Sequence, residues 1–279
     1  MEFVQPGGSV KDRAARRIIE VAIEKHELTP GQPVVEMTSG NMGAGLAIVC
    51  GILRHPFIAT MSEGNSPQRA SMLRGLGAEV VLVPQVTGIP GNVTGEDIEA
   101  AAQAARDIAA ERGAYFVNQF HALEGVKAHQ LGTGPEILTA LDNEVSAFVS
   151  VVGSGGTFVG SSRALKQANP EILCYAVEPE GTEVLAGKSI TKPRHILQGI
   201  GYGIVPPLWE PKLPDGFLAV SDDEARHMQS LLAAREGLFV GYSSAANVVA
   251  AVKLASSGKV PPLGNVVTVL CDTGLKYSF

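Results

Sequence analysis

A lysine at the start of a helix is the first residue of this sequence that could do chemistry. Lys11 follows a Gly-Gly-Ser turn at 7–9, and residues 12–19 carry the charged and apolar pattern of a helix. Glycine and serine bend the backbone at such a turn and leave amide groups pointing outward. The lysine is therefore either a surface charge, the usual case for lysine, or an amine held for a reaction.

A glycine-rich loop predicts an anion-binding site. The apolar run 147–152 leads into this loop, and helical sequence follows it. Glycines let the backbone approach an anion, and a helix N-terminus offers free amide groups and the positive end of its dipole. The sequence thus predicts a phosphate site, with a tight packing turn as the alternative, at Gly153, Ser154, Gly155, Gly156 and Thr157.

The spacing of these glycines argues against a dinucleotide. Phe158 takes the last position of the GxGxxG fingerprint, so a small monophosphate fits the loop better. Glu178 nevertheless ends the next strand, where an acid that binds ribose would lie. A dinucleotide-dependent oxidoreductase stays as a distant alternative. The segment around Lys11 lacks the GK[ST] ending of a triphosphate loop, which disfavours a kinase or ATPase.

Two further loops carry small polar residues. The loop 36–45 offers hydroxyl, amide and backbone donors to a carboxylate or phenolate, from Thr38, Ser39, Gly40 and Asn41. The alternative is a capped helix start, in which Ser39 or Asn41 only satisfies backbone amides. The turn 272–274 contains Thr273, and by itself predicts nothing more than a turn.

The elements that must position these loops alternate between apolar runs and helical stretches. This alternation is typical of crossover units that build parallel sheets. Ligands bind beyond the carboxyl ends of such strands, where the loops lie. We expect an α/β protein of two lobes, each an open, mainly parallel twisted sheet flanked by helices, joined near 121–130. Strands are expected at 33–37, 56–61, 79–84 and 115–120, and then at 147–152, 173–179 and 264–271.

Composition excludes several classes of function. The formal net charge of -6 and the lack of a basic run disfavour a nucleic-acid partner. We expect no membrane span and no export signal, and hence a cytoplasmic location. Because the three cysteines lie far apart and the histidines lack ligand spacing, we expect buried thiols and no metal, with the thiols at Cys50, Cys174 and Cys271.

Four separated motifs occur together and in order: Lys11 after Gly-Gly-Ser, TSGN at 38–41, GSGGT at 153–157 and DTG at 272–274. With them, the chain resembles the cysteine synthase (O-acetylserine sulfhydrylase) branch of the fold-type II pyridoxal-phosphate-dependent enzymes, the tryptophan synthase β-like superfamily. The likeness spans almost the full length. It includes the segments 67–84, 119–120, 132–137, 198–203 and 237–246.

The resemblance implies a role for each candidate residue. Lys11 would form a Schiff base with pyridoxal 5'-phosphate and, once released, remove the substrate's Cα proton. Asn41 would bond the ring hydroxyl, Thr273 the pyridine nitrogen, and the loop 153–157 the phosphate. The substrate would lie against Thr38, Ser39, Gly40, Met42, Gln119 and Gly201. The cofactor would occupy the cleft between a smaller lobe, 1–122, with the lysine and the carboxylate loop, and a larger lobe, 123–279, with the phosphate loop.

The reaction implied is β-replacement on an O-activated L-serine, with sulfide or a thiol as nucleophile, to give cysteine or a related amino acid. β-Elimination of the serine or threonine dehydratase type and cystathionine β-synthase activity are alternatives. The resemblance also implies a homodimer, and a serine acetyltransferase tail as a partner.

Three departures from the family pattern bear on these expectations. Met42 replaces a threonine and adds bulk near the substrate's carboxylate, and Tyr202 replaces a small residue. Family members carry a few dozen residues before the lysine, whereas this chain carries ten. If that segment is absent, we expect exposed or rearranged apolar surface and low activity, as in a weakly active cofactor-binding paralogue.

Overall fold

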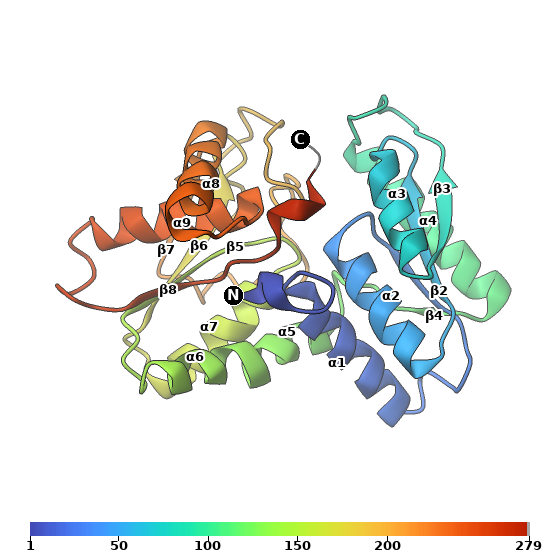
Figure 1. Cartoon of the computed structure of the whole chain (residues 1–279), viewed down its shortest axis with the longest axis horizontal. Coiled ribbons are helices and arrows are strands. Elements are labelled where there is room, and N and C mark those ends of the chain that lie inside the picture. Colours follow the sequence, from blue (N-terminus) through green and yellow to red (C-terminus); the bar gives the residue numbers. More distant parts are fainter. Residues whose placement is uncertain (278–279) are drawn as a thin grey trace. The chain divides into compact units, whose positions relative to one another are not determined.

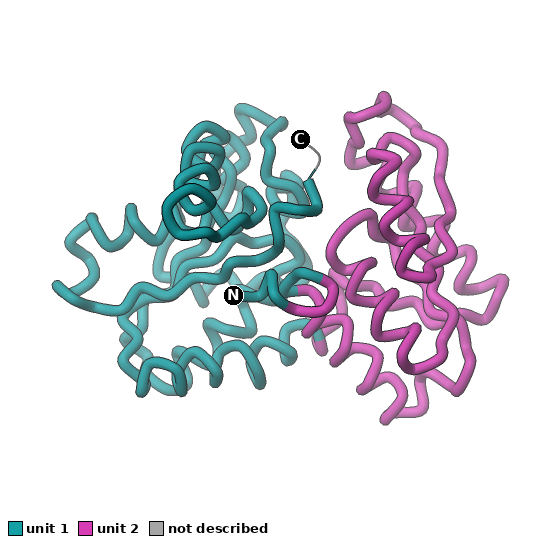
Figure 2. Tube along the Cα trace, viewed as in Figure 1, with its two compact units in different colours: residues 1–4, 8–10, 125–279 teal, residues 5–7, 11–124 magenta. Residues whose placement is uncertain are grey.

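The computed structural model describes residues 1–277, which form two compact units (Figures 1 and 2). Unit 1 contains residues 1–4, 8–10 and the chain from 125 onward, and unit 2 contains residues 5–7 and 11–124. The chain therefore passes from one unit to the other around residues 5–10 and again at 124–125. Each unit has its own sheet and its own hydrophobic core.

Unit 2 contains a four-stranded sheet in the order β3-β2-β1-β4, in which every pairing is parallel. Its strands are β1 (Val34–Met37), β2 (Phe57–Ser62), β3 (Glu79–Val83) and β4 (Tyr115–Phe116). Its helices are α1 (Lys11–Glu24), α2 (Asn41–Leu53), α3 (Pro67–Gly75), α4 (Gly95–Arg112) and the start of α5 (Leu123–Ala128).

Side-chain alternation along the strands divides the core of unit 2 between two faces. Val34 of β1 packs with apolar residues of α1, α2 and α3 on one face. Val35, the next residue, packs with Ile58 and with Ala105 of α4 on the other face. Glu36 follows Val35, so its side chain lies on the face of Val34.

Unit 1 contains a second parallel sheet, in the order β7-β6-β5-β8. Its strands are β5 (Ala147–Val151), β6 (Leu173–Pro179), β7 (Gly216–Val220) and β8 (Val266–Thr268). One face is covered by α8 (Asp222–Glu236) and α9 (Tyr242–Ala255), and the other by α7 (Gly156–Ala168) (Figure 1). Beyond α7 lie α5, the π-helix η2 (His129–Thr133) and α6 (Gly134–Ala140), while η1 (Glu2–Val4) and η3 (Gly274–Lys276) are short 3-10 helices.

Two parallel sheets flanked by helices confirm the predicted α/β class, with three local differences. The strand expected at 115–120 ends at Phe116, because Asn118 adopts a left-handed backbone with φ of 50°. The strand expected at 264–271 covers only 266–268, because Asn247 and Ser244 of α9 hydrogen-bond the backbone of Val269 and Cys271 instead. The sequence reading also missed β7 and α8.

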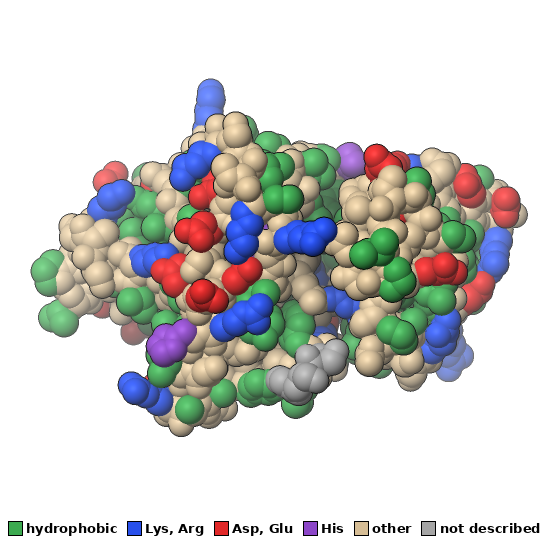
Figure 3. Space-filling model, turned by 90° about the horizontal axis from the view of Figure 1, so that it is seen from above, with side chains coloured by type: hydrophobic (Ala, Val, Ile, Leu, Met, Phe, Trp, Pro, Cys, Tyr) green, Lys and Arg blue, Asp and Glu red, His purple; other side chains and the backbone are tan. Residues whose placement is uncertain are grey.

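The described residues also bear on the composition arguments. Cys50, Cys174 and Cys271 are free and buried, as predicted. Within residues 1–277, no helix is long and apolar enough to cross a membrane, and no cluster of side chains could hold a metal ion. Basic and acidic side chains are interspersed on the face drawn in Figure 3.

Candidate functional site

The backbone just before Lys11 is hydrogen-bonded to the turn that contains Thr273. Ser9 and Asp272 form an antiparallel bridge, the Val10 N–H donates to the Cys271 carbonyl at 2.8 Å, and the Thr273 N–H donates to the Gly8 carbonyl at 3.2 Å. Lys11 is the next residue and begins α1. Two predicted site segments from opposite ends of the sequence are thus joined.

The glycine loop 153–157 leads directly into α7. Gly155 is the N-cap of α7 with φ of 97°, and no side chain caps the helix. A Cβ at Gly153 would lie 2.5 Å from the Gly199 carbonyl oxygen, so this position requires glycine. An uncapped helix N-terminus that begins with glycines suits a phosphate.

Thr157 is buried and contacts a histidine that sequence reasoning missed. Its Oγ1 lies 3.3 Å from His129 Nε2, and His129 Nδ1 lies 2.9 Å from Thr133 Oγ1. His129 is buried in the π-helix η2, an irregularity that is frequent at functional sites. The buried ring therefore restrains the hydroxyl of Thr157. The sequence signal for this contact was the spacing of His129 and Thr133, four residues apart, which places them on one face of a helix.

The loop 38–42 connects β1 to α2. Thr38 Oγ1 accepts a hydrogen bond from the Gly43 N–H at 3.0 Å, so Thr38 satisfies an amide at the start of the helix. Ser39 Oγ accepts from Arg69 Nη1 at 3.1 Å. Arg69, on α3, was not foreseen, and it brings a positive charge to this loop. The hydroxyl protons of Thr38 and Ser39 stay available to a carboxylate.

Met42 and Gln119 lie in different surroundings within unit 2. Met42 is buried in the core shared by α1, α2 and α3. Gln119 Nε2 donates to Glu36 Oε1 at 3.1 Å and to the Met37 carbonyl at 3.3 Å, which places its amide beside the start of the loop 38–42. Sequence reasoning also missed Glu36, although a glutamate inside the apolar run 33–37 was visible.

Glu36 is a carboxyl group in an apolar environment. Its side chain is 2% exposed. Burial raises the pKa of the Glu36 carboxyl to about 8, against the smaller opposing effect of hydrogen bonds from Gln119 and Asn118. The group is therefore protonated at neutral pH.

Gly201 lies in the loop 198–203 of unit 1, and this loop packs against the glycine loop through Gly199 and Gly153. Gly201 has φ of 61°, and a Cβ there would lie 2.6 Å from Pro179 Cγ. Tyr202 beside it is exposed. The loop thus needs glycine at 201 and presents a tyrosine next to it.

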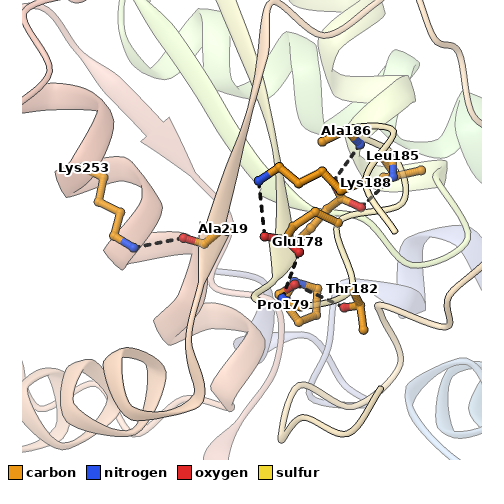
Figure 4. A network of polar contacts seen from close by, with 10 residues as sticks. Glu178, Pro179, Thr182, Leu185, Ala186, Lys188, Ala219 and Lys253 are labelled. Carbon is orange, nitrogen blue, oxygen red and sulfur yellow. Dashed lines mark hydrogen bonds and ion pairs between the residues drawn. The ribbon is translucent and has the colours of Figure 1, made fainter. Parts of the chain in front are cut away.

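Glu178 already has its hydrogen-bond partners. Its two carboxylate oxygens accept from the amides of Leu185 and Ala186 at 2.8 and 3.0 Å (Figure 4). The side chain is buried and holds the loop after β6. This use of both oxygens argues against the ribose-binding role that a dinucleotide site would need.

Comparisons with known proteins show the family to which the chain belongs. Residues 1–272 match the family described as "Pyridoxal-phosphate dependent enzyme". The chain is 37% identical over 281 residues to a cysteine synthase of Staphylococcus aureus, covering 99% of this chain and 86% of that protein.

Two solved structures are also similar. An O-acetylserine-dependent cystathionine β-synthase from Helicobacter pylori has a TM-score of 0.88 and 34% identity, with 99% of this chain and 86% of that chain covered. A hydrogen sulfide-producing enzyme from Fusobacterium nucleatum has a TM-score of 0.89 and 31% identity, with 99% and 88% covered.

Proposed function

Because the chain belongs to the family of pyridoxal-phosphate-dependent enzymes, of the cysteine synthase type, we propose that it replaces the Cβ substituent of O-acetyl-L-serine with sulfide or a thiol. The observation that carries this proposal is the hydrogen bonding between residues 8–10, which immediately precede Lys11, and residues 271–273, which include Thr273. The similarity to an O-acetylserine-dependent enzyme supports the choice of leaving group.

The residues present fit the cofactor. The uncapped N-terminus of α7 and the glycines before it suit the phosphate, and we assign that group to Gly153, Ser154, Gly155, Gly156 and Thr157. Lys11 supplies the amine for the cofactor's aldehyde, Asn41 the contact to the ring hydroxyl, and Thr273 the contact to the ring nitrogen. Bound pyridoxal phosphate supplies an electron sink for the carbanion left when the Cα proton is removed.

The loop 38–42 and Gln119 bind the substrate's carboxylate in this proposal. Thr38 and Ser39 donate their hydroxyl protons, Gly40 its amide, and Gln119 the side-chain N–H that otherwise reaches the Met37 carbonyl. Arg69, bonded to Ser39, adds a positive charge that favours the anion. Met42 shapes this loop from the core, and Gly201 is assigned to the substrate by the resemblance alone.

Thr273 favours loss of a Cβ leaving group over other reactions of the family. A hydroxyl carries no charge that would hold a proton on the ring nitrogen, as a carboxylate would. The neighbouring carboxylate, Asp272, accepts a hydrogen bond from the Tyr277 hydroxyl at 2.6 Å. Lys11 removes the Cα proton, and the departing acetate leaves Cβ open to the nucleophile.

The finer assignments follow from the same resemblance. We propose a homodimer, a cytoplasmic location, lobes bounded at 122 and 123, and a serine acetyltransferase tail as a partner. Sedimentation of the purified protein, alone and with such a tail peptide, tests the dimer and the partner.

The test of the reaction is a product analysis of protein loaded with pyridoxal phosphate. With O-acetyl-L-serine and sulfide we expect equal amounts of acetate and cysteine, and loss of both in Lys11→Ala. Pyruvate and ammonia without cysteine would instead support β-elimination, and turnover only with homocysteine would support cystathionine synthesis. Cofactor binding with no product from any of these would identify a weakly active paralogue.

A further inference from the structure

The carboxyl group of Glu36 lies in the apolar interior of unit 2, with only part of its hydrogen-bonding capacity used. Its Oε1 accepts from Gln119 Nε2, while Oε2 is buried and has no hydrogen-bond partner among the described residues. Glu36 pairs with Ala59 of β2 across the sheet, and Val34 lies on the same face. An unpaired buried polar atom destabilises the fold, so its presence calls for a function.

The ionisable groups around Glu36 do not offer it a countercharge. Strand β2 has no ionisable side chain, and burial raises the pKa of Tyr115 in β4 and brings the pKa of Cys50 in α2 to about 12, so both are neutral. Arg16 and Arg17 of α1 pair with Glu20 and Glu124, and Arg69 of α3 donates to Ser39. The pKa of Glu36 is set by burial and by hydrogen bonds from Gln119 and Asn118, with no contribution from these cations or from Lys11 and Arg13 of α1.

At the N-terminal end of α1, Asp12 accepts a hydrogen bond from the Gly7 amide. The acid is therefore kept neutral by its apolar surroundings, and the donors that reach it belong to Asn118 and Gln119.

Glu36 restrains the side chain of Gln119 through a hydrogen bond. The left-handed backbone of Asn118 ends β4 and turns Gln119 over the carboxyl end of β1. The amide nitrogen then donates to Glu36 and to the Met37 carbonyl, which immediately precedes the loop 38–42. The terminal torsion of a glutamine is otherwise broad, so without Glu36 the amide would be held only by its longer bond to the Met37 carbonyl.

We propose that Glu36 is a positioning residue: its carboxyl holds one N–H of the Gln119 amide, so that the second N–H, which reaches the Met37 carbonyl at 3.3 Å, can turn to the substrate's carboxylate. The inference rests on the proposed function, because it takes the loop 38–42 and Gln119 as the carboxylate site. An ionised Glu36 would put a negative charge behind the amide, in an interior that screens charges weakly, and would repel the substrate's carboxylate. Substrate binding should therefore weaken as Glu36 loses its proton.

Three variants separate positioning from a structural role. Glu36→Gln keeps the shape and the acceptor oxygen but cannot ionise, whereas Glu36→Ala removes the acceptor. Glu79→Gln makes the same chemical change at an exposed position of the same sheet and serves as the control.

For Glu36→Ala we expect the KM for O-acetyl-L-serine to rise about tenfold, the equivalent of one hydrogen bond, with kcat and the KM for sulfide little changed. Glu36→Gln should restore the wild-type KM. It should also abolish the rise in KM for O-acetyl-L-serine that we expect above pH 8 in the wild type and in Glu79→Gln. An unchanged KM in Glu36→Ala, or an alkaline rise that persists in Glu36→Gln, would overturn the proposal.

A second measurement needs no turnover. The infrared difference spectrum between wild type and Glu36→Gln should contain the carbonyl band of a protonated acid at pH 7. As the pH is raised and this band disappears, the NMR signal of the Gln119 side-chain amide should shift. L-Alanine has no leaving group, and its binding should shift the same NMR signal in wild type and Glu36→Gln. In Glu36→Ala the affinity for L-alanine, read from this shift, should be about tenfold lower.

A carboxylate band at pH 7, or an amide signal that ignores L-alanine, would contradict the assignment of Glu36. If the infrared and NMR signals are as expected but no cysteine forms, the proposed reaction is wrong and the assignment of Glu36 stands.

Discussion

Glu36 of unit 2 and Glu178 of unit 1 are both buried glutamates near the carboxyl ends of parallel strands, β1 and β6. Burial raises the pKa of both carboxyls. Both oxygens of Glu178 accept from backbone amides, which stabilise its charge, whereas the donors from Asn118 and Gln119 leave Oε2 of Glu36 without a partner among the described residues. The same residue in the same topological position thus fixes a loop in one unit, and in the other restrains a side chain at the candidate site.

The largest effect should be the pH dependence of stability in Glu36→Gln. The folded pKa of Glu36, about 8, lies above the usual value for an unfolded glutamate, so the folded state holds the proton more tightly. Wild-type stability should then fall from about pH 5 to pH 8, by at most about 1.4 kcal/mol per pH unit. The variant should lack this slope in urea unfolding. If stability depends on pH in the same way in the wild type and in Glu36→Gln, Glu36 does not hold its proton more tightly in the folded state, and the contrast with Glu178 is wrong.

Removing each side chain should separate them further. Glu178→Ala leaves the amides of Leu185 and Ala186 without their acceptor and should lower the free energy of unfolding by about 2–4 kcal/mol. Glu36→Ala removes a carboxyl group that has an oxygen without a hydrogen-bond partner among the described residues. This variant should therefore lower the free energy of unfolding by less than about 1 kcal/mol. Thermal melts at pH 7 give the comparison, and equal losses would argue that both carboxyls are structural.

Asp97 is a third buried carboxyl, whose pKa is shifted in the opposite direction. A hydrogen bond from the Thr94 amide, with others from Val86 and Thr87, holds its pKa well below the usual range for aspartate, although burial opposes them. Its stabilisation should be complete above about pH 4 and be lost as pH falls toward the lowered pKa. Asp97→Asn should therefore flatten the acid side of the melting profile between pH 2 and 4. A profile identical to the wild type would refute this.

The smallest effect should come from Lys188, which pairs with Glu183 at 3.5 Å in the loop that Glu178 holds. The lysine is mostly exposed, so Lys188→Ala should change the free energy of unfolding by less than about 0.5 kcal/mol. Its positive charge lowers the pKa of Glu178, so the variant should raise that pKa slightly. A large loss of stability would mean that the ion pair, rather than the backbone amides, holds this loop.

Much of the fold and several site segments followed from sequence pattern. Glycines before a helical run predicted the loop before α7, since glycine allows the close approach at Gly153 and the positive φ at Gly155. The α/β class, the enzyme type and the pyridoxal phosphate requirement are confirmed by the two parallel sheets and the family match. The residue roles assigned to Lys11 and Thr273 stay predictions.

Strand ends were less well predicted because they depend on contacts made elsewhere. The strand β8 stops where Asn247 and Ser244 of α9 take over its backbone hydrogen bonds. Such partners are distant in sequence, so an apolar run alone could not reveal them. The segment β7 was missed although its residues 217–220 are apolar, and in the structure it is a short strand that is largely half-buried.

The sequence by itself determined the alternation of strands and helices apart from β7 and α8, since hydrophobic periodicity, glycine turns and motif spacing are local properties of the chain. Only the tertiary structure decided what surrounds each polar group. The letters EM in one strand and EP in another do not distinguish a neutral Glu36 behind Gln119 from a Glu178 held by backbone amides. Desolvation and hydrogen-bond partners set the charge of a carboxyl, and both come from segments far away along the chain.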